Sequence, residues 1–264
     1  MSDLNKAVVV LTGATGGFGR ELTKQLLQAG SQLILSDIDR SALDKLAGEI
    51  SHDTGKIFAC IESDLSSREG CEILYQQVKS LGVPVDILIN NAGIGLSGRM
   101  DEVPNDKWER LMQVNLITPM RLSALFVSEM IERRQGHIVN ISSLAGWVAP
   151  AGMAHYSSSK FGLRGFSMGL WNEVKPYNVK VTAVYPFFSR TPILQSESFG
   201  TLAQSDRGFL ENIATEPADV MAKTIKAIVR NRLHVFPDRM GRTIYLIQQY
   251  FPQFGIVSEK FNTK

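Results

Sequence analysis

Short, almost wholly apolar runs alternate with longer amphipathic segments along most of this chain. Strands that are apolar throughout, rather than at alternate residues, are typical of a parallel sheet covered on both faces. The alternation therefore predicts an α/β fold in which helices connect parallel strands. The runs that we expect to be strands are Val8–Leu11, Leu33–Leu35, Ile57–Ile61, Val85–Ile89, His137–Ile141, Val179–Val184 and Leu233–Phe236.

The amphipathic segments between these runs predict the connecting helices. Ser66 and Glu69 have the spacing of a capping box at the start of the third helix, and Pro217 suits the first turn of the last one. Seven strands with such connections predict a Rossmann-type doubly wound parallel sheet with helices on both faces. The expected helices are Glu21–Ala29, Ala42–Ile50, Glu69–Ser80, Trp108–Arg133, Tyr156–Val174 and Ala218–Arg230.

Length and composition suit a single domain, residues 1–264, with no repeat or linker. The net charge is +2 and the basic residues are scattered, which gives no reason to expect nucleic acid or anionic lipid as a partner. No signal peptide and no apolar run of ~20 residues is evident. Cys60 and Cys71 lack metal-ligand spacing, so we expect a soluble, cytoplasmic protein with reduced thiols and no metal.

Two segments depart from the alternation. Residues 187–212 are rich in Ser, Gly and Gln and lie between a predicted strand and a predicted helix, where a lid could fold over a substrate. Residues 237–264 form an extension that is apolar and aromatic in its middle. This extension could line the substrate site or pack against a neighbouring subunit.

The first predicted strand runs directly into a glycine-rich turn, Thr12-Gly-Ala-Thr-Gly-Gly-Phe-Gly19, and then into a helix. Glycines let the backbone approach a pyrophosphate closely, and a helix N-terminus offers unpaired N–H groups to phosphate. A tight turn without a ligand would use the same glycines. The place of this turn in the first βα unit favours dinucleotide binding.

Asp37 ends the second predicted strand, about 20 residues beyond the glycines. An acid at this place can accept hydrogen bonds from the adenosine ribose, and its charge would repel the 2′-phosphate of NADP. Asp37 could instead cap the next helix, although Asp39 or Ser41 fits that role better. We therefore expect NAD as the cofactor.

Tyr156-Ser-Ser-Ser-Lys160 carries the candidate chemistry. Residues four apart share one face of a helix, so the Lys160 ammonium would lie near the Tyr156 phenol. A free phenol has a pKa of about 10, and a neighbouring positive charge lowers it. Tyr156 could then exchange a proton with an alcohol or ketone while hydride moves at the carbon. An ordinary exposed Tyr/Lys pair would show the same spacing.

Together these motifs resemble the short-chain dehydrogenase/reductase family, in its single-domain branch, over nearly the whole chain up to about Phe236. Thr12, Gly13, Gly17 and Gly19 fill the family's nucleotide turn, Asn90-Asn-Ala-Gly93 matches its motif after the fourth strand, and Tyr156 and Lys160 match its catalytic pair. Asp64 matches an adenine contact, and it could equally be a turn residue. The resemblance implies cofactor contacts at Thr12, Gly13, Gly17, Phe18, Gly19, Asp37, Asp64, Leu65, Asn91, Ala92, Gly93, Tyr156, Lys160, Pro186 and Thr191.

The resemblance also implies two further catalytic residues, Ser143 and Asn115. Ser143 precedes Tyr156 by thirteen residues (156 − 143 = 13), as in the family, and its hydroxyl would hold the substrate oxygen near the phenol. Ser142 is the neighbour with which it could be confused. Asn115 would help to hold a water linked to Lys160, or it could be a satisfied structural group in an apolar helix.

One motif departs from the family. Pro186 is followed by Phe187 where the family has glycine, and Thr191 keeps the position expected to contact the nicotinamide carboxamide. The substitution puts the local backbone in doubt. Phe187 could form an aromatic wall of the substrate site or point into the core.

The expected function is hydride transfer between NAD(H) and a secondary alcohol or ketone. Apolar residues at the strand ends predict a lipophilic substrate, such as a steroid-like, terpenoid, aryl or medium-chain compound. The alternatives are a 3-oxoacyl thioester reductase, which Asp37 argues against, and a non-catalytic NAD-binding scaffold, which has no reason to keep Asn115, Ser143, Tyr156 and Lys160. The expected substrate residues are Ser143, Tyr156, Leu144, Trp147, Met153, Phe187 and Phe188, with Ile94 and Leu96 beside them and Ile193, Leu194, Phe199, Leu202, Phe209 and Leu210 as a ceiling.

Family members commonly form dimers or tetramers through the two long helices, here 108–133 and 156–174. The second carries Phe161, Phe166, Met168 and Trp171, more large apolar groups than one core-facing stripe absorbs. We therefore expect a two-fold symmetric homodimer or homotetramer.

Overall fold

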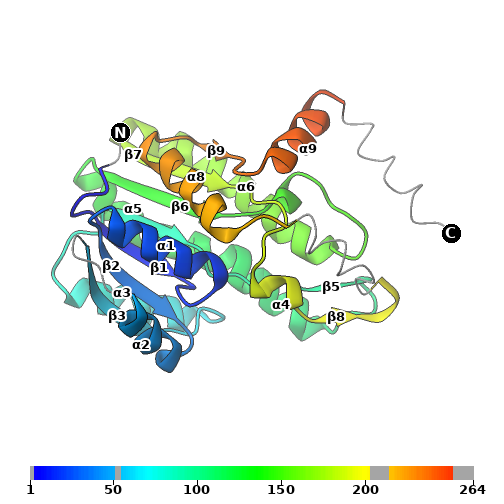
Figure 1. Ribbon diagram of the computed structural model, residues 1–264, viewed down its shortest axis with the longest axis horizontal. Helices are drawn as coiled ribbons and strands as arrows, with labels where there is room; N and C mark the ends of the chain where they lie inside the picture. Colours follow the sequence, from blue (N-terminus) through cyan, green and yellow to red (C-terminus); the bar gives the residue numbers. More distant parts are fainter. Residues whose placement is uncertain (1–2, 51–54, 203–213, 252–264) are drawn as a thin grey trace.

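A computed structural model describes residues 3–50, 55–202 and 214–251. Within them, seven parallel strands form one sheet in the order β3-β2-β1-β4-β6-β7-β9 (Figure 1). All seven predicted strands are confirmed. The order in which successive strands are added reverses between β1 and β4, as in a doubly wound sheet. The strands are β1 (Val8–Thr12), β2 (Gln32–Asp37), β3 (Lys56–Glu62), β4 (Ile87–Asn90), β6 (Gly136–Ile141), β7 (Val179–Val184) and β9 (His234–Val235).

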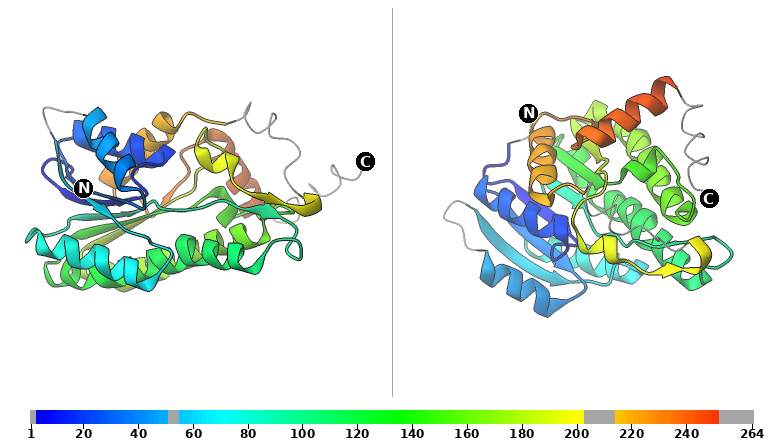
Figure 2. Two further views of the ribbon diagram at one scale, coloured as in Figure 1. Left: turned by 90° about the horizontal axis from the view of Figure 1, so that it is seen from below. Right: turned by 45° about the vertical axis from the view of Figure 1, so that its right-hand side comes forward.

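Helices cover both faces of the sheet (Figure 2). One layer contains α1 (Gly17–Gln28), α2 (Arg40–Glu49) and α8 (Pro217–Val229). The opposite layer contains α3 (Arg68–Ser80), α5 (Thr118–Glu132) and α6 (Ala154–Val174). The predicted Rossmann-type architecture is therefore confirmed.

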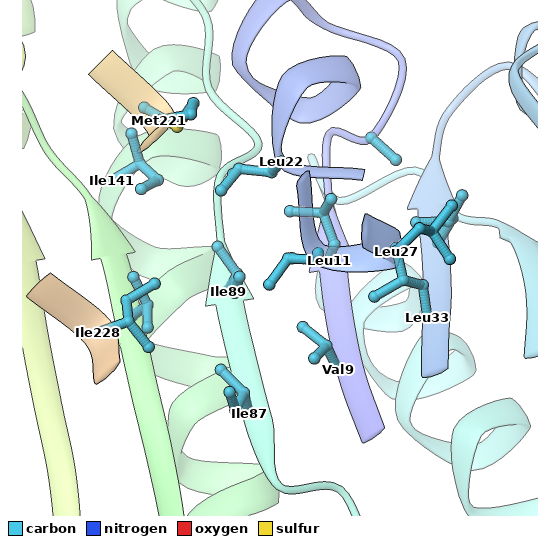
Figure 3. Packing of buried hydrophobic residues seen from close by; sticks show 14 of the residues in the cluster. Val9, Leu11, Leu22, Leu27, Leu33, Ile87, Ile89, Ile141, Met221 and Ile228 are labelled. Carbon is cyan, nitrogen blue, oxygen red and sulfur yellow. The ribbon is translucent and has the colours of Figure 1, made fainter. Parts of the chain in front are cut away.

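Successive residues of a strand face opposite layers, and this alternation builds two cores. Val9 and Leu11 of β1 pack under α1 and α8 (Figure 3). Val8 and Val10 pack over α3 and α5 on the opposite face. Because both sets are buried, β1 is apolar at every position. Burying one such side chain stabilises the fold by about 1.5–3 kcal/mol.

The predicted helix 108–133 is longer at its start and contains an irregular turn. It runs through α4 (Asn105–Met112), a π-helical turn at Gln113–Ile117, and α5. By length and composition this stretch, Asn105–Glu132, could cross a membrane. Within the described residues, however, its buried face packs against the sheet, which is the behaviour of a core helix.

The start of α3 differs by one residue from the expected capping box. Ser67, not Ser66, is the N-cap, and its side chain accepts a hydrogen bond from the Gly70 amide at 3.0 Å. The Ser66 amide instead donates to the Asp64 carboxylate at 2.9 Å. Asp64 therefore makes a turn that sets the entry of the chain into the helix.

Two further elements appear where the sequence pattern predicts none. β5 (Ser97–Gly98) pairs in parallel with β8 (Ser198–Phe199) in a small second sheet. α9 (Arg239–Tyr250) occupies the first part of the C-terminal extension. Short turns are η2 (Leu144–Gly146), η3 (Lys175–Tyr177), η4 (Pro192–Gln195) and η5 (Gly200–Leu202).

Candidate active site

The glycine turn after β1 brings backbones together where side chains would collide. Gly13 has φ +63°, and a Cβ on it would lie 2.8 Å from the Cα of Ala92. A Cβ on Gly17 would lie 2.6 Å from the methyl carbon of Thr191. These contacts bring the segments after β1, β4 and β7 to one place, at the carboxyl ends of the strands.

The start of α1 offers donors rather than receiving a cap. Gly16 is its N-cap and supplies no side chain, whereas Asp39 caps α2 and Ser67 caps α3. The first-turn N–H groups of α1 are thus without a side-chain acceptor, as a phosphate site requires. Phe18, in this turn, packs its half-buried ring against the core beneath α1.

Thr12 and Asn91 join the ends of β1 and β4. The Thr12 hydroxyl accepts from the amides of Asn91 and Ala92, both at 3.1 Å, and is buried. The Asn91 side-chain amide donates to the carbonyls of Thr12 and Gly13 at 3.0 and 2.9 Å. These two predicted cofactor residues therefore shape the turn, and contact of either with a cofactor stays a prediction.

Asp37 reaches back to the glycine turn. Its Oδ2 accepts from the amide and hydroxyl of Thr15 at 2.8 and 2.6 Å, and its Oδ1 accepts from the Ile38 amide at 2.8 Å. Asp39 is the residue that caps α2, so Asp37 is not the cap. The structure thus fixes a carboxylate beside the turn, where the ribose role requires it.

Asp64 and Leu65 follow β3. Asp64 is exposed, and its hydrogen bonds with the Ser66 side chain and amide hold the pKa of its carboxyl below the usual value. The Leu65 carbonyl accepts from the Thr118 hydroxyl at 2.6 Å, which ties this loop to α5. The turn role of Asp64 is observed, and its adenine contact stays a prediction.

Tyr156 and Lys160 lie on one face of α6, as their spacing predicts. The Lys160 Nζ is 5.7 Å from the centre of the Tyr156 ring and donates to the Ile141 carbonyl at 3.2 Å. Lys160 is only 4% exposed, and burial lowers its pKa to about 8. Burial disfavours the charged form of each group, so it raises the pKa of Tyr156.

Ser143 is the serine beside the phenol. The Ser143 hydroxyl acts on the pKa of the Tyr156 phenol in the direction opposite to burial, although burial has the larger effect. Ser143 also caps η2 by accepting from the Ala145 amide at 3.1 Å. Ser142 is buried instead and donates to the Lys160 carbonyl at 3.2 Å, so the choice of Ser143 by spacing agrees with its position.

Asn115 lies in the π-helical turn, and such turns are frequent at functional sites. Its side chain accepts from the Ile94 amide and donates to the Ile94 carbonyl, both at 2.9 Å. A Cβ on Gly93 would lie 3.3 Å from Asn115 Oδ1 and 3.7 Å from Lys160 Nζ. Asn115 is therefore a satisfied group that fixes the loop after β4 next to Lys160, and its link to a water stays a prediction.

The segment after β7 is braced from both sides. The Leu144 amide donates to the Pro186 carbonyl at 2.8 Å, and the Phe187 amide donates to Asp238 at the start of α9 at 2.9 Å. Phe187 does not have a positive φ, so the side chain in place of the family's glycine introduces no backbone strain. The centre of its ring lies 4.8 Å from the centre of the Phe188 ring, in an edge-to-face arrangement.

The predicted substrate residues fall into different surroundings. Tyr156 packs in a small apolar cluster with Ile94, Leu96 and Phe199, so this part of the expected lining is brought together. Leu144 is buried and Met153 half-buried at the N-cap of α6. Trp147 belongs to a separate aromatic cluster with Tyr185, His234, Phe236 and Tyr245. Phe209 and Leu210 lie outside the described residues.

Two buried residues that the sequence interpretation missed also hold the site. Asp238 binds the Phe187 amide, and His155 binds the Leu96 carbonyl through Nε2 at 3.0 Å. Neither belongs to a motif or stands at a telling spacing. Only the adjacency of His155 to Tyr156 could have drawn attention to it.

Comparison with known proteins gives one consistent family. The family model described as short chain dehydrogenase matches residues 7–200. The chain is 35% identical over 188 residues to a 3-oxoacyl-[acyl-carrier-protein] reductase of Aquifex aeolicus (strain VF5), covering 71% of this chain and 76% of that protein. It is 31% identical over 251 residues to epidermal retinol dehydrogenase 2 of Mus musculus, covering 93% and 78%. It is 34% identical over 200 residues to a 3-dehydrosphinganine reductase of Danio rerio, and the matched region covers 74% of this chain and 60% of that protein.

Solved structures share the fold. A short chain dehydrogenase/reductase from Burkholderia phymatum in complex with NAD has a TM-score of 0.86 at 23% identity, over 96% of each chain. A short-chain dehydrogenase from Sphingobium yanoikuyae in complex with NADPH has a TM-score of 0.80 at 24% identity, over 98% of this chain and 96% of that one. With the family match over residues 7–200, these similarities show that the chain belongs to the short-chain dehydrogenase/reductase family of oxidoreductases.

Proposed function

We propose that this oxidoreductase transfers hydride between NAD(H) and a lipophilic secondary alcohol or its ketone, with Tyr156 as the acid/base. The observation that carries the proposal is the setting of Tyr156. The Ser143 hydroxyl acts to lower the pKa of the Tyr156 phenol, Lys160 Nζ lies 5.7 Å from the centre of its ring, and Tyr156 packs in one apolar cluster with Ile94, Leu96 and Phe199.

The residues present fit a nicotinamide dinucleotide. The uncapped start of α1 offers N–H groups to phosphate, and Gly13 and Gly17 let the turn lie close to Ala92 and Thr191. When bound, the nicotinamide supplies or accepts the hydride. Tyr156 gives a proton to the ketone oxygen in reduction and takes one from the alcohol in oxidation, while Ser143 holds that oxygen near the phenol.

Asp37 supports NAD over NADP. The carboxylate is fixed by Thr15 next to the glycine turn, and a 2′-phosphate there would meet its negative charge. The same carboxylate speaks against the second candidate, a 3-oxoacyl thioester reductase, although the Aquifex aeolicus relative carries that name. The substrate test, rather than cofactor preference alone, separates the two candidates, because a 3-oxoacyl-[acyl-carrier protein] reductase from Brucella melitensis carries bound NAD in its solved structure.

The cofactor test compares wild type with Asp37→Ser, following absorbance of the reduced cofactor with NAD and NADP. Wild type should have the higher kcat/KM with NAD, and Asp37→Ser should narrow that preference. Asp39→Ser is the matched control, because serine also caps helices and this exposed acid lies off the turn. A wild-type preference for NADP would refute the role of Asp37.

The substrate test uses 2-alkanols of four to eight carbons. Burying each added methylene contributes about 0.8 kcal/mol at most, which is nearly fourfold in kcat/KM per carbon. A rising series supports the apolar site, and a flat or falling one contradicts it.

A cytoplasmic location remains part of this proposal.

A further inference from the structure

Three loops that are distant in the sequence meet near Tyr156, and one of them is the described part of the proposed lid, 187–202. The Ser97 amide donates to the Glu197 carbonyl at 3.1 Å, and the Ser97 and Ser198 hydroxyls are 2.7 Å apart. The Gly98 amide donates to the Gly152 carbonyl at 2.8 Å, just before α6. The β5–β8 pair thus fastens the lid both to the loop after β4 and to the helix that carries Tyr156.

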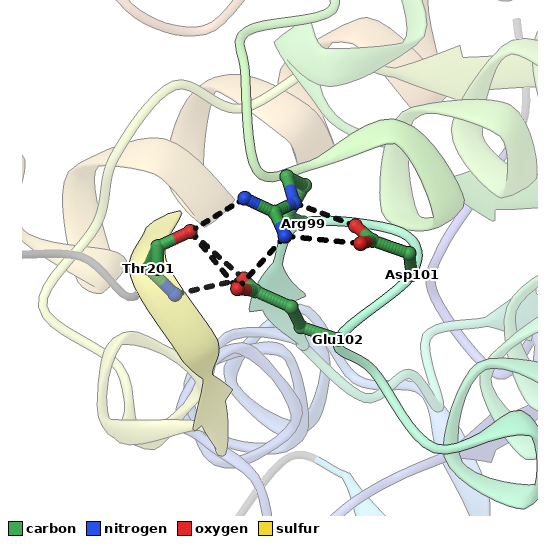
Figure 4. A network of polar contacts seen from close by, with 4 residues as sticks. All are labelled: Arg99, Asp101, Glu102 and Thr201. Carbon is green, nitrogen blue, oxygen red and sulfur yellow. Dashed lines mark hydrogen bonds and ion pairs between the residues drawn. The ribbon is translucent and has the colours of Figure 1, made fainter.

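Glu102 fastens the end of β8 (Figure 4). One of its oxygens accepts from the Thr201 amide at 2.7 Å, and both accept from the Thr201 hydroxyl at 3.0–3.1 Å. Arg99 lies 3.1 Å from the same carboxylate and donates to the Thr201 hydroxyl at 3.2 Å. The Glu102 side chain is only 20% exposed, so these charge-assisted bonds lie in a partly desolvated place.

Asp101 provides an internal comparison. It is bonded to the same Arg99, at 2.6 and 3.0 Å, but its side chain is 67% exposed and has no contact with Thr201 in the network. Lys107 and Glu197 form a second tie at 2.9 Å, with 40% and 57% exposure. Exposed ion pairs contribute little, so among the charged side chains that join the two segments Glu102 is the main tie.

Glycine makes this contact sterically feasible. Gly200 has φ +64°, and a Cβ on it would overlap the Glu102 carboxylate. Any other residue would be strained at this positive φ, and its Cβ would displace the Glu102 carboxylate. The contact of this segment with Glu102 therefore requires glycine at position 200.

The consequence concerns Phe199, the last residue of β8. Its ring packs in the apolar cluster with Leu96, Val103 and Tyr156. A two-residue strand pair is marginal on its own, so the place of Phe199 depends on what holds β8. We propose that Glu102 is a positioning residue that holds the lid through Thr201, and that Phe199, so placed, determines the preference for long apolar substrates.

This inference rests on the proposed function for its substrate, so its first test needs no activity. Amide hydrogen exchange is compared in the whole protein for wild type, Glu102→Ala and the matched control Asp101→Ala. Glu102→Ala should speed exchange at the Thr201 amide by about tenfold or more, because a charge-assisted bond is lost. Asp101→Ala should exchange like wild type. Unchanged exchange in Glu102→Ala, or equal effects of the two variants, would overturn the tie.

The second test follows the 2-alkanol series. Phe199→Ala should reduce the nearly fourfold gain per carbon to about twofold or less while Thr201 stays protected, because only the apolar contact is lost. Glu102→Ala should raise KM for octan-2-ol about tenfold and leave kcat for butan-2-ol within about twofold.

A normal gain per carbon in Phe199→Ala would refute the role of Phe199. A wild type inactive on every alkanol would refute the proposed function and that role together, and exchange at Thr201 would still decide the tie.

Discussion

Burial acts on Tyr156 and Lys160 with opposite signs and one result. It raises the pKa of the phenol and lowers the pKa of the ammonium to about 8, so each group is pushed toward its neutral form. The Ser143 hydroxyl partly offsets this effect on the pKa of Tyr156. The proton that the proposed reaction moves is therefore controlled by side chains from two elements, the loop after β6 and α6.

Tyr156→Phe should lower kcat by at least ~100-fold, since it removes the transferable proton. The dissociation constant of the cofactor, measured by titration, should be nearly unchanged. Tyr177→Phe, at an exposed tyrosine, is the control and should behave like wild type. Lys160→Ala should harm both turnover and cofactor binding. Near-normal turnover in Tyr156→Phe would exclude the proposed mechanism.

Buried His137 makes the stability of the folded protein depend on pH. It is buried in β6 with Nε2 2.8 Å from the Thr182 hydroxyl, and burial, helped by Lys180, lowers its pKa from 6.5 to about 3. The unfolded chain therefore binds more protons between these values. The stability from neutral His137 is complete above pH 6.5 and is lost as pH falls toward 3.

At 1.36 kcal/mol per pH unit, this group should account for about 2 kcal/mol of the loss in unfolding free energy between pH 6.5 and 5. Urea unfolding at these two pH values measures it. His137→Gln keeps a donor for Thr182 but does not titrate, so its loss over the same interval should be smaller by about that amount. Equal losses in the two proteins would contradict the prediction.

At the scale of elements, α6 is tied to the serine loop along one face. Lys160 donates to the Ile141 carbonyl at 3.2 Å, and Arg164, one turn further, donates to the Gly146 carbonyl at 2.8 Å while stacking 4.1 Å from the Trp147 ring. These contacts bracket Ser143. The helix that carries the acid/base thus also sets the loop that carries the serine.

The start of α9 is held by a buried carboxylate. Asp238 is 3% exposed and accepts from the Phe187 amide at 2.9 Å. Asp238→Ala should lower the unfolding free energy by about 1–3 kcal/mol, because a buried N–H loses its acceptor. Asp238→Asn, which keeps an acceptor, should recover most of this loss. Urea unfolding distinguishes them, and an alanine variant as stable as wild type would refute the brace.

The sequence predicts regular elements better than it predicts the contacts at their ends. The seven strands follow from runs of buried apolar residues. The cap of α3 is misplaced by one residue because the capping-box spacing to Glu69 favours Ser66, whereas Ser67 is the N-cap. α9 was not predicted from the sequence. In the structure its only buried residue is Gly241, and its apolar residues Met240, Leu246 and Ile247 are exposed.

At the scale of the whole molecule, apolar side chains remain exposed on the helices expected to form an interface. Ile117 and Met120 on the long helix 105–132 and Met168 on α6 are 37–41% exposed. Phe166 and Trp171, in contrast, pack in the core under α6, so Met168 is the better marker of a subunit contact.

Light scattering at micromolar concentration should show a dimer or tetramer. Met120→Glu with Met168→Glu should shift the mass toward the monomer, because buried carboxylates would be desolvated in an interface. Met240→Glu, on α9, is the matched control and should keep the wild-type mass. A monomeric wild type would contradict the expectation.

The sequence by itself determined the sheet, the glycine turn, and the spacing of Tyr156, Lys160 and Ser143, because these depend on local periodicity and on distances along one chain segment. Tertiary structure alone decided that Asp37 binds Thr15 and that Glu102 reaches Thr201 across 99 residues. Such pairs depend on the path of the whole chain. The periodicity of a sequence does not show which distant loops lie close enough to bring a carboxylate, a hydroxyl and a glycine into contact.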